Sequence, residues 1–327
     1  MTEILLQTLS HQDMDWLQSA GTAQSLKAKQ GLIDRHTFHL VLTGKLSVNQ
    51  SDLFPGDMLG LTAENWGGTV QAIDNTLLLA IPKPDIQQKL QDDPSFAAHL
   101  YHAQALLLAR RLKRLRGQFD PEDVANPPQR ESVTVFSGLQ DSDLDWMITV
   151  GKIQSIPPDT CLLQGGQPID AMHILLDGAC AVEWDGDGRS PLLKAFTKPQ
   201  NEQPREELAR LSRGDLIGET ALVNANPINL VVRTVRESKV LSIPRWRIAA
   251  KLLHDIEFAS RFYQVLATIL TNQQNILLQD DESDLDESED LAADPEFLNK
   301  VALAEARFEW MLKRIQSELG TGREIQW

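Results

Sequence analysis

Four segments of this 327-residue chain occur twice in the same order, and this internal duplication limits the fold more than any other feature. Leu9–Leu17 returns as Leu139–Met147, Phe38–Gly44 as Met172–Gly178, Phe54–Gly60 as Ser212–Gly218, and Ile81–Lys83 as Ile243–Arg245. The spacing between the copies grows from 130 residues at position 9 to 162 residues at position 81. The sequence therefore predicts two colinear copies of one folding unit, with insertions in the second.

Each copy is predicted to contain the same elements in the same order. A short helix with apolar spacing surrounds Trp16 in the first copy and Trp146 in the second. Short segments rich in Val, Ile and Leu follow, separated by Gly, Pro, Asn and Asp, as expected for strands joined by turns. Amphipathic helices close each copy, the longest being predicted over Phe96–Arg116 and Ile256–Leu278.

Changes in composition divide the chain into five parts. The copies cover residues 1–116 and 131–278, a Pro- and acid-rich linker covers 117–130, an acidic linker covers 279–295, and an amphipathic helix covers 296–327. Residues 280–296 contain ten acids and no base, so we expect the acidic linker to be disordered. Without these ten charges the formal net charge changes from −15 to −5. Residues 185–207 are predicted to form a polar hairpin loop of the second copy.

The segment Gly214–Leu222 combines a short apolar strand, a Gly-Asp turn and a glycine that precedes a predicted one-turn helix. Free backbone N–H groups at a helix start favour an anion, and glycine lets the backbone approach a phosphate closely. A loop with Pro227 and a β-branched strand follow. The pattern is typical of an anion-binding turn.

This segment resembles the phosphate-binding cassette of the cyclic-nucleotide-binding domain family, which includes Crp/Fnr-like and kinase-regulatory-subunit-like sensing domains. The family pattern is Gly-Glu-x-Ala-Leu, a short loop, then Pro-Arg, and it is matched by Gly218, Glu219, Ala221, Leu222 and Pro227. The resemblance covers both copies and implies an α+β fold. It implies two tandem antiparallel β-roll domains, jelly-roll-like and flanked by helices, with the C-terminal helix in addition.

The resemblance also implies the roles of the candidate ligand-binding residues, which are Gly218, Glu219, Thr220, Ala221, Leu222 and Asn229. Glu219 would bind the ribose 2′-hydroxyl, and the amides near Thr220 would meet the cyclic phosphate. Ile228 stands where the family has its phosphate-binding arginine. Losing two hydrogen bonds to a charged group costs roughly 3–5 kcal/mol, or more than about a hundredfold in affinity. Asn229 could donate to the anion but supplies no charge. Arg233 in the next strand is expected to be a surface strand residue, with a role as donor as the alternative.

The first copy departs further from the family pattern. Leu61 stands in the place of the glutamate, and the distance from Gly60 to Ile81 is 21 residues against 25 from Gly218 to Ile243. We expect this copy to bind no nucleotide.

No catalytic or metal-binding pattern is found, and we expect no enzyme and no cofactor except a cyclic nucleotide, if one is bound weakly. His36 and His39 are predicted to be surface and turn residues, and Cys161 and Cys180 buried thiols. The acidic composition argues against DNA binding. No apolar run reaches the roughly 20 residues of a membrane span. The N-terminus lacks the positive charge of an export signal, so a cytoplasmic protein is expected.

Two further segments suggest partners. The basic run 110–116 would stabilise the end of its helix, pair with the acidic linker or contact an anionic partner. The C-terminal helix, predicted from about Asp294 to Leu319, carries an apolar stripe from Phe297 to Ile315, which we expect to bind a protein partner or a second copy of the chain.

The sequence favours a non-catalytic regulatory or scaffold protein that uses diverged cyclic-nucleotide-binding-like domains for protein interaction. The alternative is a cyclic AMP or cyclic GMP sensor that binds through the second copy and signals by moving its C-terminal helices.

Overall fold

The computed structural model describes residues 2–32, 34, 36–48, 51–62, 69–116, 131–164, 167–184, 207–223, 230–278 and 295–320. The chain forms two compact units, one of Met1–Leu115 with Asp255–Ser283 and the other of Arg116–His254 with Asp284–Trp327. The predicted linkers, apart from Pro295, and the predicted loop, apart from Glu207, lie outside the described residues. The first unit therefore includes a helix that the sequence analysis assigned to the second copy.

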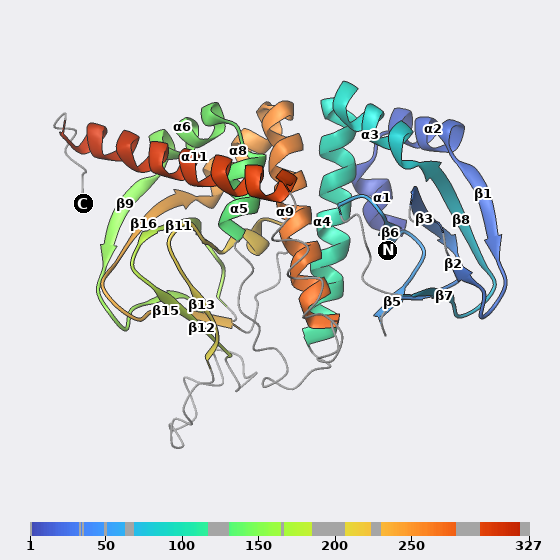
Figure 1. Cartoon of the computed structure of the whole chain (residues 1–327), viewed down its shortest axis with the longest axis horizontal. Coiled ribbons are helices and arrows are strands. Elements are labelled where there is room, and N and C mark those ends of the chain that lie inside the picture. The colour runs from blue at the N-terminus through green and yellow to red at the C-terminus, as the bar shows by residue number, and fades with distance from the viewer. Residues whose placement is uncertain are drawn as a thin grey trace, which may run out of the picture. The chain divides into compact units, whose positions relative to one another are not determined.

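The first unit has a roll of short strands enclosed by helices (Figure 1). Its elements are α1 (Thr2–Thr8), α2 (His11–Ala20), β1 (Thr22–Leu26), β2 (Gly31–Leu32), β3 (Thr37–Thr43), β4 (Leu46–Val48), β5 (Ser51–Leu53), β6 (Met58–Leu59), β7 (Val70–Ala72), β8 (Thr76–Pro82), α3 (Lys83–Asp92), α4 (Pro94–Arg116) and α9 (Ile256–Leu278).

The second unit repeats this order as far as α8, the counterpart of α3, and adds a C-terminal helix, while the counterpart of α4 is α9 in the first unit. Its elements are α5 (Glu131–Gly138), α6 (Asp141–Val150), β9 (Lys152–Ile156), β10 (Cys161–Leu163), β11 (Ala171–Asp177), β12 (Cys180–Trp184), β13 (Glu207–Leu211), β14 (Leu216–Ile217), the 3₁₀ helix η2 (Glu219–Leu222), β15 (Leu230–Thr234), β16 (Ser238–Pro244), α8 (Arg245–His254) and α11 (Pro295–Gly320).

The sheets confirm the duplication, because each copy has two antiparallel sheets with the same strand order. The first copy has β1-β8-β3-β6 and β2-β7-β4-β5, and the second has β9-β16-β11-β14 and β10-β15-β12-β13. The register also repeats, since Phe38 pairs with Ile81 in one copy and Met172 with Ile243 in the other. The predicted α+β fold of two tandem antiparallel β-rolls flanked by helices is thus confirmed.

A Gly-Asp turn closes each roll in the same way. The Asp57 carboxylate accepts a hydrogen bond from the Phe54 amide at 2.8 Å, and Asp215 accepts one from the Ser212 amide at 2.7 Å. Both aspartates are buried, and their backbone carbonyls accept from the strand amides of Val41 and Leu175, each at 3.0 Å. Burial raises the pKa of the Asp215 carboxyl. The carboxylate therefore replaces solvent as the acceptor for an interior turn.

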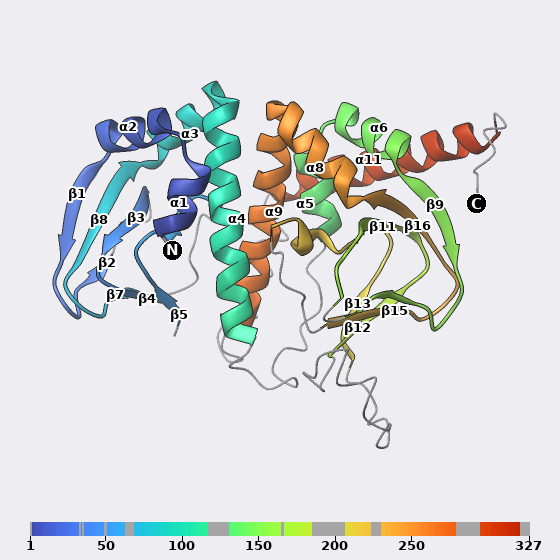
Figure 2. The ribbon, with the colours of Figure 1, turned by 180° about the vertical axis from the view of Figure 1, so that it is seen from behind.

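Helices α4 and α9 are equivalent elements of the two copies and lie side by side in the first unit (Figure 2). Each has 23 residues. The ring of His102 on α4 stacks on Tyr263 of α9 at 4.2 Å between centroids. The core beneath them includes Ile4, Leu5, Phe38, Leu40, Ile81, Phe96, Leu100, Ala103 and Leu107.

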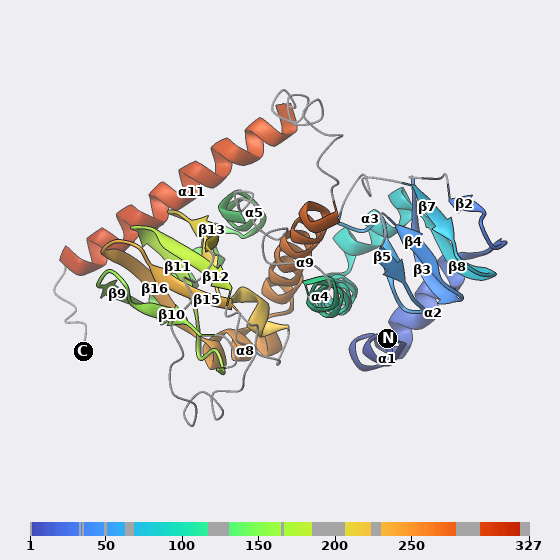
Figure 3. The same cartoon turned by 90° about the horizontal axis from the view of Figure 1, so that it is seen from below.

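Helix α11 packs along α5 and α6 of its own unit, and Figure 3 shows it beside α5. Its predicted apolar face is confirmed in part, because Ala304, Phe308, Met311 and Ile315 are buried whereas Phe297 at its start is exposed. The Phe308 ring meets Phe136 edge-on at 5.0 Å between centroids. Arg307 Nη1 donates to the carbonyls of Phe136, Ser137 and Leu139, at 3.0, 3.2 and 2.6 Å, and so caps the C-terminus of α5.

This packing differs from the expectation that the apolar stripe of α11 needs a partner or a dimer mate. The chain itself covers most of the stripe, because α5 offers an apolar surface that the acidic linker does not. Exposed apolar side chains remain on α11 at Phe297, Leu298, Leu303 and Trp310.

Three smaller expectations were wrong. His39 is fully buried on β3 rather than at the surface. Cys161 is exposed, whereas Cys180 is buried as predicted. In the basic run, Arg111 points inward and pairs with Asp57 rather than stabilising the helix end. The side chains of His39 and Arg111 lie on elements that are covered on the side they face, so both are buried.

None of the described helices is both long and apolar enough to cross a membrane.

The packing of α11 predicts a large cost for losing the Phe308 ring. Phe308→Ala should lower the free energy of unfolding by about 3 kcal/mol, because a buried ring leaves a cavity against Phe136. Leu303→Ala, at an exposed position on the same helix, should cost less than about 1 kcal/mol. Urea denaturation measures both. Equal losses would show that α11 is not part of the core of its unit.

The stack of His102 on Tyr263 predicts a loss of stability in acid. Burial, with a smaller contribution from His99, lowers the pKa of His102 to about 4. The unfolded chain takes up this proton near pH 6.5. Stability should therefore fall between pH 6.5 and about 4, by at most about 3 kcal/mol from this group. His102→Phe keeps a ring and does not titrate. Urea denaturation should give a shallower pH profile for this variant, and parallel profiles would contradict the assignment.

Candidate functional site

The cassette segment forms a sharp turn at the end of β14. Strand β14 pairs with β11, and Gly218 follows it with a φ of 87°. A Cβ atom at Gly218 would lie 3.1 Å from Cγ2 of Ile169 and 3.2 Å from the Ala171 carbonyl oxygen. Both the left-handed backbone and the close contact explain why glycine occupies this position.

The predicted one-turn helix is present as η2, Glu219–Leu222. The turn therefore brings Gly218, Glu219, Thr220, Ala221 and Leu222 together. Glu219 is buried, with 7% of its surface exposed. Asn229 and Ile228 lie outside the described residues. The ligand role of all these residues remains a prediction.

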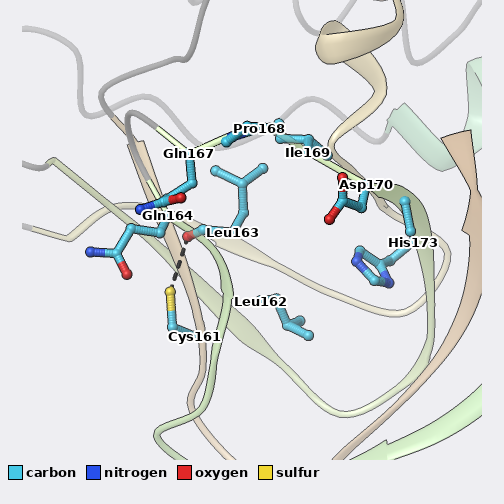
Figure 4. Close-up of a pocket in the computed structure, with 10 residues that line it drawn as sticks. Cys161, Leu162, Leu163, Gln164, Gln167, Pro168, Ile169, Asp170 and His173 are labelled. Atoms are coloured by element: carbon cyan, nitrogen blue, oxygen red, sulfur yellow. Dashed lines mark hydrogen bonds between the residues drawn. The ribbon is translucent and has the colours of Figure 1, made fainter. Parts of the chain in front are cut away.

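A cavity of about 360 Å³ lies between the residues of β10, the segment after it and the start of β11 (Figure 4). It is lined by Cys161, Leu162, Leu163, Gln164, Gln167, Pro168, Ile169, Asp170, Ala171 and His173. Ile169 and Ala171 are also the residues that contact Gly218, so the cavity and the turn are neighbours. No lysine or arginine is among these lining residues, and Asp170 adds a carboxylate.

The lining side chains suit neutral polar groups better than an anion. Burial lowers the pKa of His173, which favours its uncharged imidazole. The Cys161 thiol donates to the Leu163 carbonyl at 3.2 Å. This cavity was not predicted from the sequence, because its lining residues on β10, on β11 and in the segment between them match no motif.

Arg233, the alternative cation of the second copy, is held by other groups. Its Nη1 donates to the Asp159 carbonyl at 2.8 Å, and its Nε lies 3.8 Å from Oε2 of Glu183. It therefore already has acceptors beside the β10–β15–β12 sheet.

In the first copy the equivalent turn has another composition. The φ angle is 80° at Gly60 and 87° at its counterpart Gly218, so both glycines have the left-handed backbone. Leu61 and Thr62 follow it, and Thr62 shares a hydrogen bond with Thr271 of α9 at 2.8 Å. A protein side chain thus contacts this turn.

Among the described residues, no group of three or more His, Cys, Asp or Glu side chains is arranged to hold a metal ion.

A model of a known protein family matches most of the second copy. The profile of the family described as "Cyclic nucleotide-binding domain" matches residues 153–255. No match was found among the curated proteins.

Several solved structures are similar to the chain. The regulatory domain of Toxoplasma gondii PKA with cAMP is 16% identical over 78% of this chain and 89% of that chain, with a TM-score of 0.30. The N-terminal domain of a Streptomyces coelicolor transcriptional regulator is 17% identical over 41% and 86%, with a TM-score of 0.33. The regulatory subunit of a cAMP-independent protein kinase A from Trypanosoma brucei is 12% identical over 74% and 78%, with a TM-score of 0.28.

The family match spans β9 to α8 and includes the cassette turn. Residues 153–255 of the second copy are thus similar to the cyclic nucleotide-binding domain family.

Proposed function

We propose that this chain is a non-catalytic regulatory protein whose second copy has the shape of a cyclic-nucleotide site without the charge that would bind a cyclic nucleotide tightly. Domains of this family are generally regulatory rather than catalytic. In this function the tandem fold serves mainly for protein interaction rather than for nucleotide binding.

The observation that carries the proposal is the absence of a basic side chain from the described lining of the cavity beside the cassette turn. The lining of the neighbouring cavity contains Asp170 and no basic residue, and Arg233 is held by Asp159 and Glu183. A cyclic phosphate carries one negative charge, and a bidentate arginine normally offsets the cost of desolvating it. The backbone amides of η2 would supply hydrogen bonds but no net charge.

A cyclic nucleotide sensor is the second candidate. It is favoured by Gly218 with its left-handed backbone, by the buried Glu219 and by η2, which together have the form expected of the family's cassette. In this candidate the second copy would bind cyclic AMP or cyclic GMP, and its C-terminal helices would respond.

A protein partner of this regulator would meet surface that the chain leaves uncovered. On α11 that surface includes Leu298, Leu303 and Trp310, with exposed fractions of 52%, 43% and 37%. The buried face of the same helix is already occupied by α5 and α6.

Isothermal titration calorimetry with cyclic AMP and cyclic GMP tests the proposal. We expect Kd values no tighter than about 100 µM, because two hydrogen bonds to a charged group are missing. Ile228→Arg should tighten binding at least about tenfold. Ile228→Met, similar in size and uncharged, should have no effect.

Adding Glu219→Ala to Ile228→Arg should remove the gain, if the nucleotide occupies the cassette. A submicromolar Kd for the unmodified chain would refute the proposal and establish the sensor. A Kd unchanged by Ile228→Arg would show that the cassette does not accept the nucleotide even with its arginine restored.

A further inference from the structure

Helix α9 is seated against the first copy through polar side chains rather than through an apolar face alone. The contacts join α9 to α4 and to the turn after β6, where the first copy has its counterpart of the cassette. All of these elements lie within the first unit.

The first set of contacts centres on a buried ion pair. Arg111 Nη2 lies 2.9 Å from Oδ1 of Asp57, and their side chains are 6% and 0% exposed. Arg111 Nη1 also donates to Oε1 of Gln274 on α9, at 3.2 Å. The arginine therefore links the Gly-Asp turn of the first roll to a helix of the second copy.

This ion pair exists in only one copy. Asp215 is the counterpart of Asp57, while Gln273 stands at the position equivalent to Arg111. The basic residue is thus a departure from the duplicated pattern, and it lies where α9 meets the first copy.

The second set of contacts uses Thr62, two residues after Gly60. The Thr62 and Thr271 hydroxyls lie 2.8 Å apart, and Gln104 Nε2 donates to the Thr62 hydroxyl at 2.9 Å. In the family pattern the residues after this glycine meet the ligand. Here they meet a helix of the same chain.

Both sets leave polar atoms without a partner. Within the described part of the chain, Nε of Arg111 and Oε1 of Gln104 are buried and form no hydrogen bond. A partly satisfied polar network gives less stability than an apolar contact of the same size. It does fix a register, because each donor must meet its own acceptor. Such an interface specifies one position of the helix, while most of its burial comes from apolar side chains of α9 such as Phe258, Phe262 and Ile269.

We propose that the degenerate cassette of the first copy is a docking site for α9, held by a polar latch that the helix can leave and re-enter in one register. The latch consists of Asp57, Arg111 and Gln274 with Thr62, Gln104 and Thr271. It does not depend on which ligand the second copy takes. Opening it would be the conformational change through which the two copies influence each other.

A disulfide across the latch tests whether α9 opens by itself. Thr62→Cys with Thr271→Cys, in full-length chain carrying Cys161→Ser, places two thiols at the 2.8 Å hydroxyl contact. Oxidation should form the bond and slow hydrogen exchange of the α9 amides at least tenfold relative to the reduced protein. The β8 amides should not change. Failure to form the bond, or equal α9 exchange in the two states, would overturn the proposal.

A charge deletion tests the ion pair independently. Arg111→Met should speed exchange in α9 at least tenfold relative to Lys113→Met, which removes an exposed charge from the same helix. Exchange in β8 should stay the same in both variants. If β8 and α9 accelerate equally in Arg111→Met, the ion pair supports the roll as a whole, and the latch is refuted.

Discussion

A buried aspartate at a Gly-Asp turn is the interaction on which each roll depends. Asp57 and Asp215 accept hydrogen bonds from the amides of Phe54 and Ser212, in turns that enter the core. A turn placed there without an acceptor would leave buried amides unsatisfied, at roughly 1–3 kcal/mol each. The aspartate removes this cost and sets the position of the glycine that follows, and hence of the whole cassette turn.

The two copies use this common turn differently. In the first, Asp57 is paired with Arg111, and the shortened turn after it contacts α9 through Thr62. In the second, the turn is followed by η2 and lies beside a cavity lined without basic residues. A few side chains therefore decide whether the duplicated turn contacts a helix of the same chain or lies beside a cavity.

The C-terminal helix illustrates how a tertiary contact changes the interpretation of an amphipathic pattern. Its stripe predicts burial, and Phe308, Met311 and Ile315 are buried. The pattern does not indicate which surface covers these side chains. For α11 this surface is α5, because the three hydrogen bonds from Arg307 to the end of α5 fit one orientation of the helix. Periodicity specifies a face, whereas the partner of that face depends on surfaces distant in the sequence.

The sequence by itself determined the duplication, the order of elements, the limits of α9 and the cassette turn, because these depend on local spacing, glycine and proline. It also placed Ile228 at the position of the family's phosphate-binding arginine, so that the positive charge of that arginine is missing. Only the tertiary structure decided that Arg111 points inward, that His39 is buried and that α9 is seated on the first copy. It also decided that Cys161 and Asp170 line one cavity. These features depend on contacts between residues up to about 200 positions apart, such as Thr62 and Thr271. Such contacts leave no periodic trace in the chain, because any pair of complementary polar groups would satisfy them.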